Sequence, residues 1–291
     1  MEKTISLAEH RKGILAIVLA AIVWSSGGLF IKLLPFDALT ILFYRSGCAA
    51  LLFAAVYRQQ IFRFNKLSLM ASGFYCCLLI AFVSSTKLTT AANAIFLQYT
   101  APIYVLLLEP LIFRSKIRKP DLWCIAACML GMFLFFGDQF GGGSIKGNLL
   151  GLLSGITLAG FILSQRLNTP DHHFAAIFWG NILVLIVTYT AFAQAPTPNT
   201  QQWAMLLFLG FVQIGIGYMA FTYGLNRSTA TESSLLAMLE PILNPIWVMI
   251  GYGETPSLLA GVGGGIILTA LALRTLYLEK EKRKILREEA Q

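Results

Sequence analysis

The chain has 291 residues, of which 57% are hydrophobic and only 12% are charged. Soluble domains usually carry about 25% charged residues, and a folded chain of about 300 residues still leaves about a quarter of its surface in water. The composition therefore excludes a soluble globular protein and predicts an integral membrane protein. The net charge of +8 does not indicate nucleic-acid binding, because the basic residues form short clusters between long apolar runs, as in loops that face anionic lipid.

Ten apolar runs are long enough, or nearly so, to cross a membrane, which takes roughly 20 residues as a helix. Short segments with turn residues separate them, such as Pro35-Phe36-Asp37 and the triple glycine at 141–143. The first run is longer than the apolar core of a cleavable signal peptide. We therefore predict an all-α bundle with spans at 13–34, 38–57, 67–86, 91–113, 121–138, 146–166, 173–194, 202–223, 229–252 and 256–277.

The distribution of positive charge supports this count. Ten spans put both termini on one side, and the side richer in Lys and Arg is the cytoplasm. On this assignment 18 basic residues are cytoplasmic, Arg45 lies inside a span, and only Lys32, Lys87 and Lys146 face outward. A missed helix would exchange the sides of all later loops and destroy this asymmetry. Cytoplasmic N- and C-termini are therefore predicted.

The two halves of the chain resemble each other. A stretch that begins at Gly73 matches one that begins at Gly210, with Pro102 aligned to Pro241. Each half has five spans, an odd number, so the second half would enter the membrane from the opposite side. Inverted repeats are typical of secondary transporters, whose solute sites lie near the midplane between the halves. The predicted units are a five-helix repeat at 1–140, a second at 141–278 and a charged cytoplasmic tail at 279–291.

Several segments together resemble the EamA-type branch of the drug/metabolite transporter superfamily. They are WSSGGLFIK at 24–32, FYR at 43–45, and Pro241 followed by GETP at 253–256. The resemblance implies a proton- or gradient-driven carrier or facilitator in a bacterial inner membrane, usually an exporter of amino acids or related metabolites. The first half departs from the pattern, with RSKI at 114–117 where the second half has GET. The halves are therefore not expected to be interchangeable in function.

Glu240 is the strongest candidate for ion or proton coupling. It lies about 12 residues into the ninth predicted span, which is about 18 Å along a helix and near the midplane. Pro241 follows it and frees a backbone carbonyl of the preceding turn. An ionisable group at this depth is a functional candidate by default, because a carboxyl kept from water exchanges its proton closer to neutral pH. The alternative is a structural acid bonded to backbone or to a tyrosine.

Three further charged residues have competing interpretations. Arg45, about 10 Å below the outer surface, is able to hold a substrate carboxylate bidentately; alternatively it ties helix ends together or extends to the surface. Glu109 is predicted to pair with the basic loop that follows it. Glu232, at the start of the ninth span, is predicted to cap that helix, where an acid suits the helix dipole.

Polar and aromatic residues within the spans predict a cavity for a zwitterionic or moderately apolar solute. Plain helix packing is the alternative for each of them singly. Glycine pairs four residues apart, Gly151 with Gly155 and Gly261 with Gly265, predict close helix approaches. The predicted substrate-binding residues are Trp24, Arg45, Gln98, Tyr99, Gln165, Trp179, Asn181, Gln213, Tyr218 and Asn244.

Other chemistries leave no pattern in the sequence. It contains no phosphate-binding loop, zinc-protease motif or serine-nucleophile motif, and its cysteines and histidines lack metal-ligand spacing. We predict a non-enzymatic secondary transporter without cofactor or metal, working by alternating access as a monomer or homodimer in contact with lipid. A carrier of nucleotide-sugars or organic anions, and a lipid-handling membrane protein without transport activity, are the alternatives.

Overall fold

A computed structural model describes residues 6–63, 65–89, 91–114, 116–135, 144–252 and 258–288 of the chain. In these ranges the regular secondary structure is helical. The helices are α1 (Leu7–Ser25), α2 (Gly27–Leu33), α3 (Ala38–Val56), α4 (Lys66–Leu88), α5 (Ala91–Gln98), α6 (Ala101–Phe113), α7 (Lys119–Phe135), α8 (Ile145–Leu167), η2 (Pro170–His172), α9 (His173–Ala193), α10 (Thr200–Leu207), η3 (Phe208–Ile216), α11 (Gly217–Leu225), α12 (Ala230–Ala237), α13 (Leu239–Tyr252) and α14 (Leu258–Glu288).

Eight helices in the described part of the chain are long and apolar enough to cross a membrane, which supports a multi-pass membrane protein. They match eight of the ten predicted spans. The predicted span at 121–138 corresponds to α7 and continues beyond the described residues, and the one at 229–252 is divided into α12 and α13. The total of ten remains a prediction.

Polar residues fix where several helices begin. Asp37 precedes α3, and its Oδ1 accepts hydrogen bonds from the backbone N–H groups of Leu39 at 2.8 Å and Thr40 at 3.0 Å. Burial acts to raise the pKa of Asp37, but hydrogen bonds from the Thr40 hydroxyl and the backbone outweigh it and leave the pKa below its usual value. Asn65 and Asn199 form capping boxes before α4 and α10. These side chains satisfy backbone donors that a helix start leaves unpaired.

Two of the predicted spans are broken at corresponding places. The fourth turns at Tyr99 and Thr100, between α5 and α6, and the ninth turns at Met238, between α12 and α13. Pro102 and Pro241 each follow shortly after the break. Proline cannot donate the backbone hydrogen bond that a continuous helix needs, and this favours a break in the preceding turn. The first span also turns, at Ser26, and the eighth widens into the π-helix η3. π-Helical segments are rare and occur frequently at functional sites.

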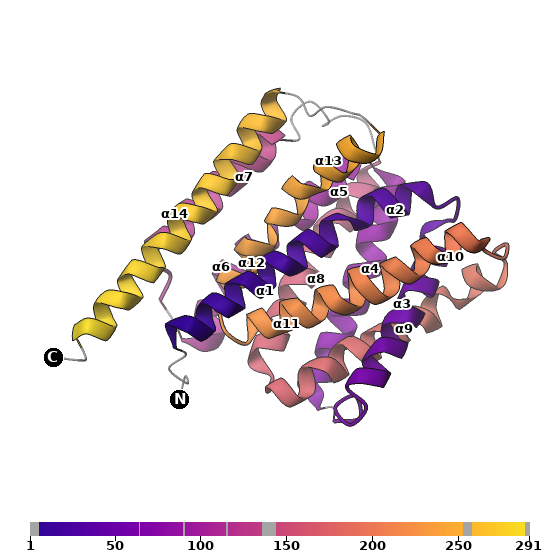
Figure 1. Ribbon diagram of the computed structural model, residues 1–291, viewed down its shortest axis with the longest axis horizontal. Helices are drawn as coiled ribbons and strands as arrows, with labels where there is room; N and C mark the ends of the chain where they lie inside the picture. Colours follow the sequence, from indigo (N-terminus) through magenta and orange to yellow (C-terminus); the bar gives the residue numbers. More distant parts are fainter. Residues whose placement is uncertain are drawn as a thin grey trace.

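The helices form a bundle with an attached pair (Figure 1). Within the bundle α4 packs on α8 and α9, α3 on α9, and α1 on α11, while α7 and α14 run side by side at one edge. The helix α1 begins and α14 ends at the same end of the molecule (Figure 1), which we call the terminal end. Its assignment to the cytoplasm remains a prediction from the charge distribution.

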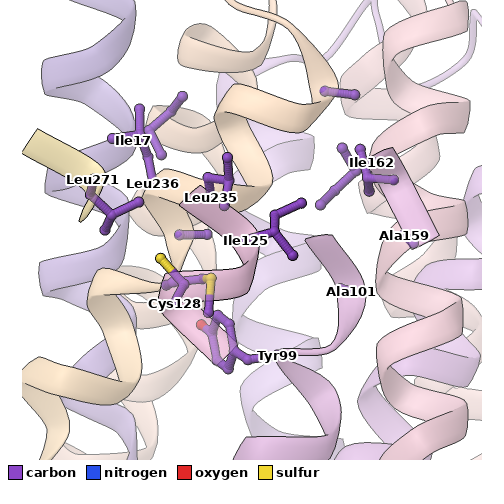
Figure 2. Packing of buried hydrophobic residues seen from close by; sticks show 14 of the residues in the cluster. Ile17, Tyr99, Ala101, Ile125, Cys128, Ala159, Ile162, Leu235, Leu236 and Leu271 are labelled. Atoms are coloured by element: carbon purple, nitrogen blue, oxygen red, sulfur yellow. The ribbon is translucent and has the colours of Figure 1, made fainter. Parts of the chain in front are cut away.

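The largest apolar cluster joins residues of both halves. Figure 2 shows part of it, with Ile17 of α1, Ile125 of α7 and Leu235 of α12 packed together. A close crossing lies beside it, where a Cβ atom on Gly155 of α8 would stand 2.7 Å from the backbone oxygen of Leu97.

The predictions for the two glycine pairs have different outcomes. A Cβ atom on Gly151 would meet Ser85 and Leu97 at 3.0–3.1 Å, so this pair lies at a close helix approach. The same prediction for Gly261 and Gly265 of α14 is wrong for the described chain, in which no atom lies within 4 Å of a Cβ built there.

Candidate functional site

A cavity lies where the broken helices meet. Its walls come from α1, α3, α4, α8, the breaks α5–α6 and α12–α13, and the η3–α11 segment. The lining residues are Trp24, Arg45, Leu78, Leu79, Phe82, Gln98, Tyr99, Ala101, Pro102, Leu158, Ile162, Gln213, Ile214, Tyr218, Phe221, Ser234, Ala237 and Glu240. Helix breaks leave backbone groups and side chains free to face a solute, so the local irregularities and the cavity belong together.

The cavity is narrow in this conformation. Its total empty space, including space open to solvent, is about 680 Å³, but the centres of water-sized groups reach only about 70 Å³ of it. The smaller volume is the one that decides what fits, and it has room for about five water molecules at 10–15 Å³ each. Side chains or helices must therefore move before a solute larger than a few water molecules is enclosed.

Glu240 and Tyr99 join the two broken helices. Glu240 is the second residue of α13, and Tyr99 lies at the break between α5 and α6. The Tyr99 hydroxyl donates a hydrogen bond to Oε2 of Glu240. Both side chains line the cavity, and the first turn of α13 favours a negative charge at this position. The structural alternative from the sequence, an acid bonded to a tyrosine, is thus present, in a carboxyl group that also faces the cavity.

Arg45 is a buried cation on the wall of the same cavity. Its side chain lines the cavity although the residue is only 4% exposed. Its Nη2 donates to Oε1 of Gln213 at 3.0 Å, and Nε2 of Gln213 donates to the backbone oxygen of Trp24 at 3.3 Å. The Nε of Arg45 is buried with no hydrogen-bond partner among the described residues. The alternative in which Arg45 extends to the membrane surface is wrong, since the helices around it cover the guanidinium.

Arg45 therefore has unused binding capacity. An arginine keeps its charge at any physiological pH and has five N–H donors. In the described part of the chain Arg45 makes no ion pair, and a buried charge without a directly bound counter-charge is unfavourable. A carboxylate that enters the cavity would supply the missing charge and acceptors.

Aromatic rings form the wall beside these charged groups. The ring centroids of Trp24 and Tyr218 are 4.8 Å apart, those of Trp24 and Phe221 are 5.2 Å apart, and Tyr75 packs behind Tyr218 at 4.9 Å. Seven of the predicted site residues are thus brought to one cavity: Trp24, Arg45, Gln98, Tyr99, Gln213, Tyr218 and Glu240.

Three predicted residues with described side chains, Gln165, Trp179 and Asn181, are not among those that line the cavity. Gln165 donates to the backbone oxygen of His173 at 3.2 Å, and the Trp179 indole donates to that of Ile61 at 2.9 Å. Asn181 lies behind the wall and donates to the Tyr75 hydroxyl at 3.3 Å. The side chain of Asn244 lies outside what the structure describes.

Two acidic residues have partners that differ from those predicted. Glu109 accepts hydrogen bonds at 2.8 Å from the backbone N–H groups of Ala230 and Thr231 and another from the Thr231 hydroxyl. It therefore covers the start of α12 and is buried away from the basic loop. Glu232 lies in the first turn of α12, but Thr229 provides the N-cap, and the Glu232 carboxylate instead contacts the side chains of His10 and Arg274.

The apolar wall of the cavity was not foreseen. Leu78, Leu79 and Phe82 of α4, together with Leu158 and Ile162 of α8, line it. In a membrane protein nearly every helix face is apolar, so residue type alone does not separate a cavity wall from a lipid-facing surface. These wall residues are identified by the place of their helices in the fold, because α4 and α8 pack against the broken spans.

Comparison with known proteins identifies related sequences along nearly the whole chain. The model of the EamA-like transporter family matches twice, over residues 11–137 and 145–276. The pseudopaline exporter CntI of Pseudomonas aeruginosa is 24% identical over 272 residues, covering 89% of this chain and 94% of that protein. The biotin transporter of Escherichia coli K12 is 26% identical over 246 residues, covering 78% and 79% of the two chains.

Two other comparisons extend over similar lengths. An uncharacterized transporter of Archaeoglobus fulgidus is 23% identical over 264 residues, covering 90% of this chain and 96% of that protein. A crystal structure has a TM-score of 0.76 at 18% identity, covering 91% of this chain and 96% of the solved one. At this identity the structural likeness establishes the fold.

Proposed function

Because the chain belongs to the EamA-like transporter family, whose members include transporters of small molecules, we propose that it exports an amino-acid-like solute by alternating access. It would act as a secondary carrier in the inner membrane, with both termini in the cytoplasm. The family and the names of the relatives indicate transport, not catalysis. The solute, the direction and the coupling are the parts that we add.

The observation that carries the proposal is a cavity with Arg45 and Glu240 both on its walls. A zwitterionic solute matches this pair, because its carboxylate fits the guanidinium and its ammonium group fits the carboxylate. Such a solute is neutral overall, and inside the low-dielectric site each of its two charges would be paired with one of these oppositely charged side chains. The rings of Trp24 and Tyr218 and the aliphatic wall would take its side chain.

Glu240 is the proposed coupling site for a proton or cation. Protonation, or a bound cation, would weaken the hydrogen bond that its carboxylate accepts from Tyr99 and so loosen the contact between the α5–α6 and α12–α13 breaks. These breaks belong to different matches of the family model. Their contact is therefore a place at which the two halves would move relative to each other during alternating access. Uncoupled facilitated diffusion remains the alternative.

The alternative solutes fit the cavity less well. A nucleotide-sugar or another multiply charged anion favours several cationic groups, but among the described lining residues Arg45 is the only cation. A lipid-handling role without a solute site gives no reason for a buried arginine that makes no direct ion pair among the described residues.

Counterflow in proteoliposomes tests the proposal. Vesicles preloaded with one unlabelled compound are given the labelled form, for a panel of amino acids, organic anions and amines. We expect uptake of at least one amino acid above that of empty vesicles, and loss of this uptake in Arg45→Gln but not in Arg227→Gln, whose arginine lies outside the cavity. Uptake that is confined to organic anions, or absent for every compound, would overturn the amino-acid proposal.

The coupling role needs a separate measurement. The pH dependence of counterflow is compared between the unaltered chain, Glu240→Gln and the control Glu9→Gln, whose carboxylate pairs with Lys12 and Arg227. We expect Glu240→Gln alone to flatten the pH profile. An unchanged profile would remove the proton role and favour facilitated diffusion or coupling to another cation.

A further inference from the structure

A cluster of buried charges lies at the terminal end of the bundle, apart from the solute cavity. Arg274 of α14 lies between two carboxylates, with Nη2 at 2.6 Å from Asp121 of α7 and Nη1 at 3.4 Å from Glu232 of α12. His10 of α1 lies at 2.8 Å from the other oxygen of Glu232. The side chains of Arg274, Asp121 and Glu232 are 3%, 9% and 4% exposed. We call these four residues the terminal ion cluster.

The terminal ion cluster lies between the cavity and the terminal end. Ser234 and Ala237 of α12 line the cavity, and Glu232 precedes Ala237 by five residues on the same helix. At 1.5 Å per residue this places Glu232 about 8 Å from Ala237 and about 3 Å from Ser234 along the helix, on the side toward the terminal end. All eight residues of α12 are buried, so the helix fills the space between the two sites.

Through Glu232, the cluster also joins the packed α7–α14 pair to α12 and α1. Asp121 belongs to the first match of the family model, and Glu232 and Arg274 belong to the second. Through these contacts α1, α7, α12 and α14 are joined at one level. The ion pairs of Glu9 with Lys12 and with Arg227 lie at the same end but nearer the surface.

We propose that the terminal ion cluster is a gate, in which Arg274 holds the terminal end closed by binding Asp121 and Glu232 together. Ion pairs suit a gate for a physical reason. In the closed state the charges are compensated by one another, and in the open state entering water hydrates them, so the gain and the loss of solvation nearly cancel. Two states of similar free energy result, which an apolar seal would not give because opening it would expose apolar surface to water.

The gate proposal rests on the alternating access proposed above, but its test does not use transport. Accessibility of a cavity cysteine to a charged, membrane-impermeant methanethiosulfonate reports opening directly. The five native cysteines are replaced by alanine, and Ala237→Cys or Leu158→Cys is introduced as the reporter. Lys119→Cys, exposed at the start of α7, measures access to the terminal end itself. Reagent is added to each face of membrane vesicles in turn.

With the cluster intact, both cavity reporters should react slowly from the face on which Lys119→Cys reacts fast. Arg274→Gln should accelerate them by roughly tenfold or more from that face, since a buried carboxylate pair without its cation strongly disfavours the closed state. Arg274→Lys keeps a cation and should stay near the unaltered rate. The control Glu9→Gln, which breaks surface pairs at the same end, should change nothing.

Two results would overturn the gate. One is fast reaction of the cavity reporters from the terminal face while the cluster is intact, and the other is an unchanged rate in Arg274→Gln. If Arg274→Gln does not reach the membrane, Glu232→Gln makes the comparison, because it weakens the contact of α12 with α14 while Arg274 keeps Asp121 as a partner. A failed amino-acid panel with a positive accessibility result would leave the gate standing and reject only the solute.

Discussion

Replacement of Glu109 should reveal how strongly the two halves are held together at the start of α12. Glu109 is 8% exposed, and its carboxylate accepts hydrogen bonds from two backbone N–H groups of α12 at 2.8 Å each. In Glu109→Ala both donors would be buried without an acceptor, which costs about 1–3 kcal/mol for each. We therefore expect a loss of about 4 kcal/mol in the free energy of unfolding, within a range of about 2–6 kcal/mol.

Glu109→Gln separates hydrogen bonding from simple side-chain volume. Its amide keeps one oxygen as an acceptor but presents an NH₂ group to the other backbone donor, so the loss should be about half as large, or about 2 kcal/mol. The free energy is measured by reversible unfolding in mixtures of a mild detergent and dodecyl sulfate, followed by tryptophan fluorescence.

The control for this series is Glu9→Gln, a carboxylate in surface ion pairs, which should produce no resolvable change because such pairs contribute little. If Glu109→Ala were as stable as this control, the contact with α12 would not be structural. The pairing with the basic loop that the sequence predicted would then be the better explanation of Glu109.

Two further predictions concern local structure. Gly155→Ala should destabilise the bundle, since its Cβ would meet the Leu97 backbone oxygen at 2.7 Å. Gly261→Ala on α14 meets nothing within 4 Å and should be neutral or stabilising by up to about 1 kcal/mol through helix propensity. Thermal unfolding in detergent distinguishes the two variants, and equal losses of stability would contradict the packing. Asp37→Ala should cost about 1 kcal/mol through loss of the α3 cap. Because folding lowers the pKa of Asp37, its contribution should be complete above its unfolded pKa and lost as the pH falls through the lower folded pKa, so a mutant that retains the acid loss of stability would refute this assignment.

The sequence predicted most of the fold because membrane helices follow two simple constraints. Length and apolarity define the spans, and eight of the predicted spans are found in the described part of the chain. The helix breaks were less visible. Pro241 correctly marked one near Glu240, but the turn at Ser26 and the π-helix around Gln213 have no proline, and they depend on packing between helices.

The candidate site was predictable by composition but not by helix face. Arg45, Tyr99 and Glu240 meet at the cavity although they come from three spans, because ionisable and polar groups at mid-depth avoid lipid. Gln165 and Trp179 are equally polar or aromatic, yet they bind backbone oxygens between α8, α9 and the loop after α3. A buried amide is satisfied equally well by a backbone carbonyl or by a cavity group, so the sequence alone does not distinguish the two.

The position of α12 suggests how the cavity and the proposed gate communicate. Its first turn holds Glu232 of the terminal ion cluster and is covered by Glu109, and its last residue is followed by the break before Glu240. All eight residues of α12 are buried among packed neighbours, and a packed helix can shift as a unit. A shift of the break at Met238, caused by solute or proton at Glu240, would therefore be carried along α12 to Glu232. Opening of the gate requires that same displacement, so occupancy of the cavity and closure of the terminal end are expected to be linked through α12.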